Sequence, residues 1–116
     1  MVNDAEAKKI IAIVAAKVRD DYQPEKIILY GSFAYGKPGK DSDIDLLIVK
    51  ETQARPIDRR VMVRRMVSGL RKGYPFSSIV VTPRELSARI DMGDQFFGEI
   101  LSKGEVLYAK QRISLS

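Results

Sequence analysis

Residues 29–49 read LYGSFAYGKPGKDSDIDLLIV. The short apolar run from Lys26 to Tyr30 predicts a buried strand, which Gly31-Ser32 ends. A loop rich in Gly and Pro follows. The residues from Asp43 to Val49 predict a second strand, whose second half is strongly apolar. Two strands joined by a polar, glycine-rich loop therefore form the centre of the expected fold.

The sequence on either side of this centre predicts helices that alternate with strands. Helices are expected over residues 4–20, from Pro56 to about Lys72, from a Thr82 cap onward and over residues 91–102. A further strand is expected over Phe76–Val81, and Val106–Tyr108 is expected to form a last edge strand or a docked tail. Asn3 and Glu6 have the spacing of a capping box, and Gly73 and Gly104 are expected to end two helices. Residues 1–116 thus predict a single α/β (α+β) domain in two layers, with helices packed on a small mixed sheet of three to five strands.

Composition excludes several kinds of chemistry. The chain of 116 residues contains neither Cys nor His. Disulfides, thiolate sites and Ser-His-Asp catalysis are therefore excluded, and carboxylates, hydroxyls, backbone amides, Lys and Arg must carry any reaction. The longest apolar run, Ile10–Ala16, is well short of the ~20 residues that a membrane span needs. With no signal-peptide pattern at the start, we expect a cytoplasmic protein without a membrane partner.

Two carboxylates open the second predicted strand. Residues two apart on a strand point to the same face, so Asp43 and Asp45 are expected to project together. Two close carboxylates repel each other unless a cation lies between them, and Mg²⁺ binds one or two carboxylates together with substrate phosphates. Gly31 allows close approach of the backbone to a phosphate at the start of a helical turn, which Ser32 can cap or complement with its hydroxyl. The stretch therefore predicts a site for a metal-bound nucleoside triphosphate.

The layout Gly31-Ser32, ten residues, Asp43-Ile44-Asp45 resembles the signature of the DNA polymerase β-like nucleotidyltransferase superfamily. Length, element order and the endings Val81-Thr82-Pro83 and Gly104–Tyr108 are similar to its minimal members, the MNT proteins. The resemblance implies transfer of a nucleoside monophosphate from a nucleoside triphosphate to a hydroxyl of a protein or small acceptor, with two Mg²⁺ ions. It also implies that Gly31 and Ser32 hold the β and γ phosphates, and that Asp43 and Asp45 are catalytic and ligate the metals.

The chain departs from the family pattern at one position. The third carboxylate of the family is expected about five residues before the Thr-Pro exit, where this chain has Ser77, or Ser78 if the register shifts by one. A serine hydroxyl is a poor general base and a weak, neutral ligand. Three interpretations stay open. A carboxylate from elsewhere replaces the missing one, with Glu85, Asp91 and Asp94 as candidates; catalysis continues slowly with two carboxylates; or the protein binds nucleotide or a partner without transfer.

Positive charge is concentrated in one segment. Residues 51–72 contain seven basic and two acidic residues, an excess that equals the net charge of +5 for the whole chain. In the helix predicted there, Ile57, Val61, Met66 and Leu70 are expected on the buried side and Arg60, Arg64 and Arg71 together on another side.

This arginine face predicts an anionic partner, such as nucleic acid or an acidic protein, or else a solvated helix face. No aromatic residue is interleaved with the arginines, so base stacking is not indicated. Because MNT proteins often pair with a small helical HEPN protein as an antitoxin–toxin module, the resemblance makes a protein partner at least as expected as nucleic acid.

Overall fold

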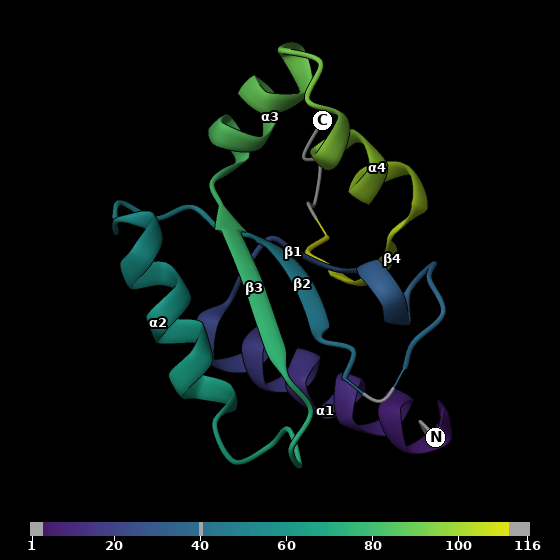
Figure 1. Cartoon of the computed structure of the whole chain (residues 1–116). Coiled ribbons are helices and arrows are strands. Elements are labelled where there is room, and N and C mark those ends of the chain that lie inside the picture. Colours follow the sequence, from purple (N-terminus) through teal and green to yellow (C-terminus); the bar gives the residue numbers. More distant parts are fainter. Residues whose placement is uncertain (1–3, 40, 112–116) are drawn as a thin grey trace.

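The computed structural model describes residues 4–39 and 41–111 (Figure 1). Asn3, and with it the expected capping box, lies outside the described residues. The elements in chain order are α1 (Asp4–Tyr22), β1 (Lys26–Tyr30), the single 3-10 turn η1 (Gly31–Phe33), β2 (Ile44–Val49), α2 (Pro56–Val67), β3 (Phe76–Val81), α3 (Pro83–Asp91), α4 (Gln95–Lys103) and β4 (Glu105–Ala109). The predicted α/β class with a small mixed sheet is confirmed. None of the helices among the described residues is long and apolar enough to cross a membrane.

The four strands form one sheet in the order β3-β2-β1-β4. β1 is antiparallel to both β2 and β4, whereas β2 and β3 are parallel and are joined through α2. A parallel pair needs such a crossover, because the chain must return to the end at which it started. The register places Asp45 of β2 opposite Tyr30 of β1 and opposite Ser77 of β3. Paired residues share a face of the sheet, so these three side chains lie side by side.

The sheet is covered on both faces, unequally. α1 and α2 cover one face, and the main core lies between them and the sheet (Figure 1). The buried residues there include Val14, Val18, Ile27, Leu29, Leu46, Ile48, Val63 and Val67. A smaller apolar cluster on the other face joins Ile28, Leu47 and Val49 to Phe97 and Ile100 of α4. The period-two alternation that fills both clusters leaves Asp45 and Ser77 on the α4 side, at the start of β2 and β3.

Helix α2 differs from the prediction in its length and in its buried side. It ends at Val67 rather than near Lys72, and Gly69 follows with a left-handed backbone at φ +85°. Arg71 therefore lies beyond the helix, and the predicted single helical stripe of three arginines is wrong.

The predicted buried side of α2 is also wrong at two positions. Ile57 and Val61 are 55% and 41% exposed. Arg59, Val63 and Val67 face inward instead. The apolar pattern missed this orientation because it assigns every arginine to the surface, and the guanidinium of Arg59 is buried among hydrogen-bond acceptors.

The C-terminal third contains one further correction. The segment 91–102 is not one helix, because α3 continues to Asp91 and α4 begins only at Gln95, after a turn at Gly93 with φ +76°. The helix end at Gly104 and the last edge strand are confirmed. The predicted Thr82 cap of α3 is confirmed as a full capping box with Glu85.

Candidate functional site

The two candidate metal-binding carboxylates stand at the entrance to β2. Asp43 precedes the strand and is exposed, and Asp45 is its second residue and is half-buried. Neither side chain forms a hydrogen bond or an ion pair with another described residue. Burial, and then the charge of Asp43, raises the pKa of Asp45 to about 6. The folded chain thus holds two neighbouring negative charges without a cation of its own, which is unfavourable unless a ligand compensates them.

Gly31 brings the two halves of the motif into contact. Its backbone is left-handed, with φ +76°, and a Cβ added at this position would collide with Oδ2 of Asp45. Glycine is therefore required twice, for its conformation and for the close approach of the carboxylate. The residue proposed to hold phosphate and a residue proposed to hold metal are direct neighbours, although 13 positions separate them in the chain.

Ser32 lies inside η1 rather than at its cap. The residue in the N-cap position is Tyr30, which makes no side-chain capping bond, so the expected capping role of Ser32 is wrong. η1 has only three residues, and its dipole contributes little to phosphate binding. The Ser32 hydroxyl is half-exposed and makes no hydrogen bond to another described residue, which leaves it available to a ligand. Gly36 lets the loop fold back onto this turn, because a Cβ there would lie 2.8 Å from Cα of Ser32.

Ser77 occupies the β3 position that faces the carboxylates. It is paired with Asp45 in the β2–β3 register and is half-exposed, whereas Ser78 is buried and points to the opposite face. Of the two serines, the register therefore gives Ser77 as the neighbour of Asp45. In the part of the chain that the structure describes, no group of three or more His, Cys, Asp or Glu side chains is placed to hold a metal ion.

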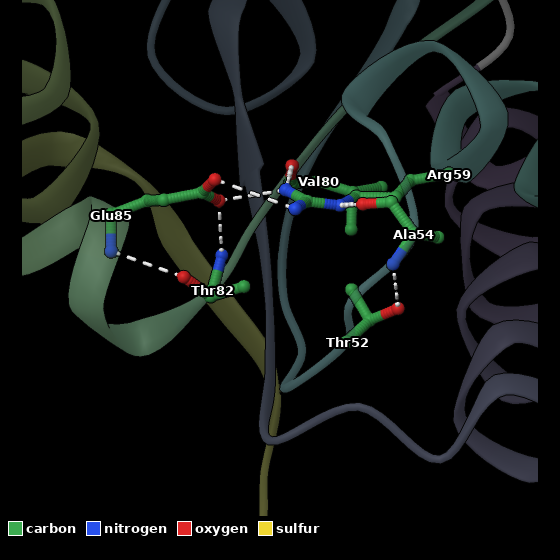
Figure 2. Close-up of polar contacts among 6 residues, drawn as sticks. All are labelled: Thr52, Ala54, Arg59, Val80, Thr82 and Glu85. Carbon is green, nitrogen blue, oxygen red and sulfur yellow. Dashed lines mark hydrogen bonds and ion pairs between the residues drawn. The ribbon is translucent and has the colours of Figure 1, made fainter.

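None of the three replacement carboxylates joins the pair. Glu85 accepts hydrogen bonds from Arg59 at 2.7 Å and from the backbone N–H of Thr82 at 2.8 Å (Figure 2), and these bonds lower its pKa. Asp94 caps α4 by accepting from the N–H of Phe97 at 3.1 Å. Asp91 lines a different cleft, between α3, α4 and the outer ends of β1 and β4. The hypothesis that one of them replaces the third carboxylate is therefore wrong.

Tyr30, which the sequence pattern assigned to a buried strand, is a further candidate for the site. Its ring is buried and packs edge-to-face on Phe96, with 5.8 Å between centroids. Burial and then the charge of Asp45 raise the pKa of Tyr30 to about 12, while Arg60 acts in the opposite direction. The hydroxyl thus stays protonated beside the carboxylates, where it can donate a hydrogen bond. The antiparallel register, which the sequence does not show, creates this proximity.

The three candidate partner-surface arginines gather around the start of β3. Arg64 donates to the backbone carbonyl of Phe76 at 3.1 Å. Arg71 donates to the carbonyl of Tyr74 at 3.4 Å and lies 6.0 Å from the ring centroid of Phe76. Arg60 is exposed on α2 and forms no hydrogen bond or ion pair with another described residue. They converge through tertiary structure rather than along one helical stripe.

Comparison with known proteins agrees with this geometry. The family model of the nucleotidyltransferase domain matches residues 9–97, which include the whole candidate site. The chain belongs to the nucleotidyltransferase domain family. The resemblance read from the motif is thereby confirmed at the level of the family.

A curated relative and several solved structures are similar to this nucleotidyltransferase domain. A Methanocaldococcus jannaschii protein, provisionally named a protein adenylyltransferase, is 42% identical over 66 residues, which are 54% of this chain and 45% of that protein. The match spans less than half of the relative's length. A nucleotidyltransferase of Sulfolobus solfataricus, also provisionally named, superposes with a TM-score of 0.63 at 20% identity, covering 92% of this chain and 84% of that one.

Two toxin–antitoxin structures share the fold as well. One, described as a toxin–antitoxin with AMP-PNP, has a TM-score of 0.59 at 19% identity over 86% of this chain and 74% of that one. The other, a mutant of the toxin–antitoxin MntA–HpeT, has a TM-score of 0.56 at 20% identity over 95% and 76%. At these identities the likeness establishes the fold alone.

Proposed function

We propose that this nucleotidyltransferase domain transfers a nucleoside monophosphate from an Mg²⁺-bound nucleoside triphosphate to a hydroxyl of a protein or small acceptor. The observation that carries the proposal is the uncompensated Asp43–Asp45 pair, whose Asp45 carboxylate lies directly against Gly31. Structural carboxylates are normally paired, so a repelling pair at a glycine turn is typical of a site built for a cation and phosphates.

The donor set fits magnesium. Carboxylate oxygens are the ligands that Mg²⁺ prefers, and a divalent ion would oppose both the burial and the charge of Asp43, which together raise the pKa of Asp45. When bound, two Mg²⁺ ions supply charge neutralisation at the attacking and leaving oxygens. Gly31 and Ser32 would bind the β and γ phosphates, and the protonated Tyr30 hydroxyl would donate to a phosphate oxygen.

The reaction needs little covalent chemistry from the protein. The acceptor oxygen forms a bond to the α phosphorus, the bond to pyrophosphate breaks, and pyrophosphate leaves. The acceptor proton passes to water, because a metal ion bound by Asp45 would oppose protonation of that carboxylate. The main contribution of this chain is therefore positioning and electrostatic stabilisation.

Transfer of label tests the proposal. The protein is incubated with each of the four α-³²P-labelled nucleoside triphosphates, Mg²⁺ and an extract of the source organism as acceptor mixture, and label in protein and in small molecules is measured. Asp43→Asn and Asp45→Asn are each expected to reduce transfer about 100-fold or more. Asp41→Asn, in the same loop and also exposed, should change transfer less than about twofold. Undetectable transfer with every triphosphate, or unchanged transfer by Asp45→Asn, would contradict it.

A second candidate is a partner-binding module of the antitoxin kind that binds nucleotide without transferring it. Ser77 favours it, because the position opposite Asp45 holds a neutral hydroxyl where the resemblance expects a third carboxylate. The toxin–antitoxin pairs among the structural neighbours support a protein partner, for which a HEPN-type helical protein is our proposal.

The variant Ser77→Asp separates the two candidates. For a module without activity, the added carboxylate should raise transfer from background by about tenfold or more, whereas the uncharged Ser77→Asn should not. Robust transfer by the wild-type protein would exclude the module as the main function.

A further inference from the structure

Two clefts meet at Ser77 and cross the edge of the sheet. The larger, of about 470 Å³, lies between β3, α2 and α3, and Tyr30 and Arg89 contribute to its walls. The smaller, of about 140 Å³, lies on the outer side of α2, between that helix and the start of β3. Arg60, Ser77 and Ser78 line both clefts. The two clefts therefore form a single groove, here called the β3 groove. It leads from the face of the sheet that carries Asp45 to the outer side of α2.

The floor of the β3 groove is the edge of the sheet, where some backbone groups of β3 have no hydrogen-bond partner in the part of the chain that the structure describes. The carbonyls of Pro75 and Val81 accept hydrogen bonds from the β2 side, so the intervening backbone groups of Phe76, Ser78 and Val80 point outward. Arg64 donates to the Phe76 carbonyl at 3.1 Å and Arg59 to the Val80 carbonyl at 3.2 Å.

These two guanidinium groups occupy both ends of the edge. They prevent a whole strand from pairing with β3, as cationic side chains on edge strands commonly do. The backbone of Ser78 between them is left without a partner among the described residues. The edge is therefore closed to an extended strand of another chain.

The charges along the β3 groove are mostly positive. Arg60 has no polar partner in the described part of the chain, Arg64 uses only one of its five N–H donors, and Arg89 has a long contact of 3.9 Å to Asp94. The only acidic side chain among the residues that line the two clefts is Glu85, which Arg59 already engages. The groove thus attracts anions.

Apolar side chains distinguish between classes of anionic partner. Ile57 and Val61 are exposed and line the smaller cleft together with Arg60 and Arg64. The phosphate backbone of nucleic acid offers no apolar surface to these aliphatic side chains. The face of α2 also carries no aromatic ring on which bases could stack. A polypeptide with both acidic and apolar side chains complements them.

We propose that the β3 groove is the acceptor channel of the transferase and selects a polypeptide hydroxyl flanked by acidic residues, with Arg60 and Arg64 binding the acids. This inference rests on the function proposed above. It also gives Ser77 a role, because a carboxylate there would repel an acidic acceptor at the entrance to the groove. The absence of the third carboxylate and the presence of the arginines then both favour an acidic acceptor.

Binding of defined peptides tests the groove without requiring catalysis. The probes are a fluorescein-labelled peptide with a central Tyr between three Glu on each side, and the same peptide with Gln in place of Glu. Fluorescence anisotropy should show about tenfold tighter binding of the Glu peptide to the wild-type protein. Arg60→Gln should remove most of this preference, and Ser77→Asp should weaken it. Arg65→Gln is the matched control, since Arg65 is the helix neighbour that lines a separate hollow with Asp58 and Met62.

The outcomes separate the groove from the proposed function. Asp45→Asn should bind the Glu peptide at least as tightly as wild type does, because it removes a negative charge beside Ser77, while losing transfer of label to its Tyr. Acid-selective binding without any transfer by wild type would overturn the proposed function and support the selectivity of the groove. Equal affinity for both peptides, or an unchanged preference in Arg60→Gln with an unchanged melting temperature, overturns the groove proposal. Tighter, Arg60-dependent binding of a single-stranded oligo(U) RNA overturns it in favour of nucleic acid.

Discussion

The molecule contains two charged clusters, and only one of them has its charges compensated by neighbouring residues. At the junction of α2, β3 and α3, Arg59 and Glu85 compensate each other within a complete set of hydrogen bonds (Figure 2). At the start of β2, Asp43 and Asp45 repel each other, and no described residue compensates them. The charges of the first cluster are satisfied within the fold, whereas those of the second are not. The contrast supports the Asp43–Asp45 cluster as the proposed functional site without reference to any family.

The hydrogen bonds between Arg59, Glu85 and the surrounding backbone stabilise the junction of α2, β3 and α3. Arg59 is 5% exposed, and its Nε donates to the Ala54 carbonyl at 2.7 Å while Nη1 reaches Val80 and Glu85. Glu85 also closes the Thr82 capping box, so one carboxylate joins a helix start to a buried guanidinium. The Arg59 side chain thus connects α2 to β3 and to the start of α3.

Replacing Arg59 with Met should be the most damaging change to stability. It leaves the Ala54 and Val80 carbonyls and the Glu85 carboxylate without their donor, and we expect a loss of about 3 kcal/mol in the free energy of unfolding, measured in urea. Arg55→Met is the control on the same helix, because Arg55 is 79% exposed and pairs with Asp58 at 3.0 Å only at the surface. It should cost less than about 0.5 kcal/mol. Equal losses would show that the junction is not a structural centre.

Gly31→Ala breaks the contact on which the uncompensated cluster is built. The new methyl group meets Oδ2 of Asp45 and the backbone is strained at φ +76°, so we expect a loss of about 2 kcal/mol. Gly69→Ala is the matched control, since its φ is +85° but a Cβ there has nothing within 4 Å. The strain alone should cost about 1 kcal/mol. The excess in Gly31→Ala measures the contact with Asp45, and no excess would contradict the geometry.

The difference between the clusters also explains what the sequence could predict. Local periodicity is sufficient for the bounds of β1 and β3 and for Ser77 at its distance from Thr82. Burial of Arg59 could not be inferred, because its acceptors come from three separate segments.

The contact of Gly31 with Asp45 and the proximity of Tyr30 to the carboxylates likewise depend on the β1–β2 register. The end of α2 at Val67 follows from the turn at Gly69 rather than from the later Gly73. Local patterns thus predicted the elements, and tertiary contacts decided how charges are compensated.

Asp45→Asn should stabilise the protein while it abolishes transfer. The pKa of Asp45 is raised to about 6, so the folded state holds the proton more tightly than the unfolded state and loses stability as pH rises through about 6. After discounting for partial exposure, the variant should gain about 1 kcal/mol over wild type near pH 8 and almost nothing near pH 4. Urea unfolding of both proteins at the two pH values measures this difference. A variant less stable at the higher pH would mean that Asp45 has a structural partner.

The smallest predicted effect is stabilisation by Mg²⁺, and it is the most direct test of the proposed metal site. Addition of about 10 mM MgCl₂ near pH 8 should stabilise wild type by about 0.5 kcal/mol if the metal binds without nucleotide at millimolar affinity. The gain should vanish in Asp45→Asn, and also near pH 4, where Asp45 is protonated. NaCl of equal ionic strength is the control, since screening would also weaken the repulsion between Asp43 and Asp45. If NaCl reproduces the whole gain, the two carboxylates are relieved by any salt and are not a magnesium site. If only Mg²⁺ produces it, the cluster that the fold leaves uncompensated is one that a divalent ion completes.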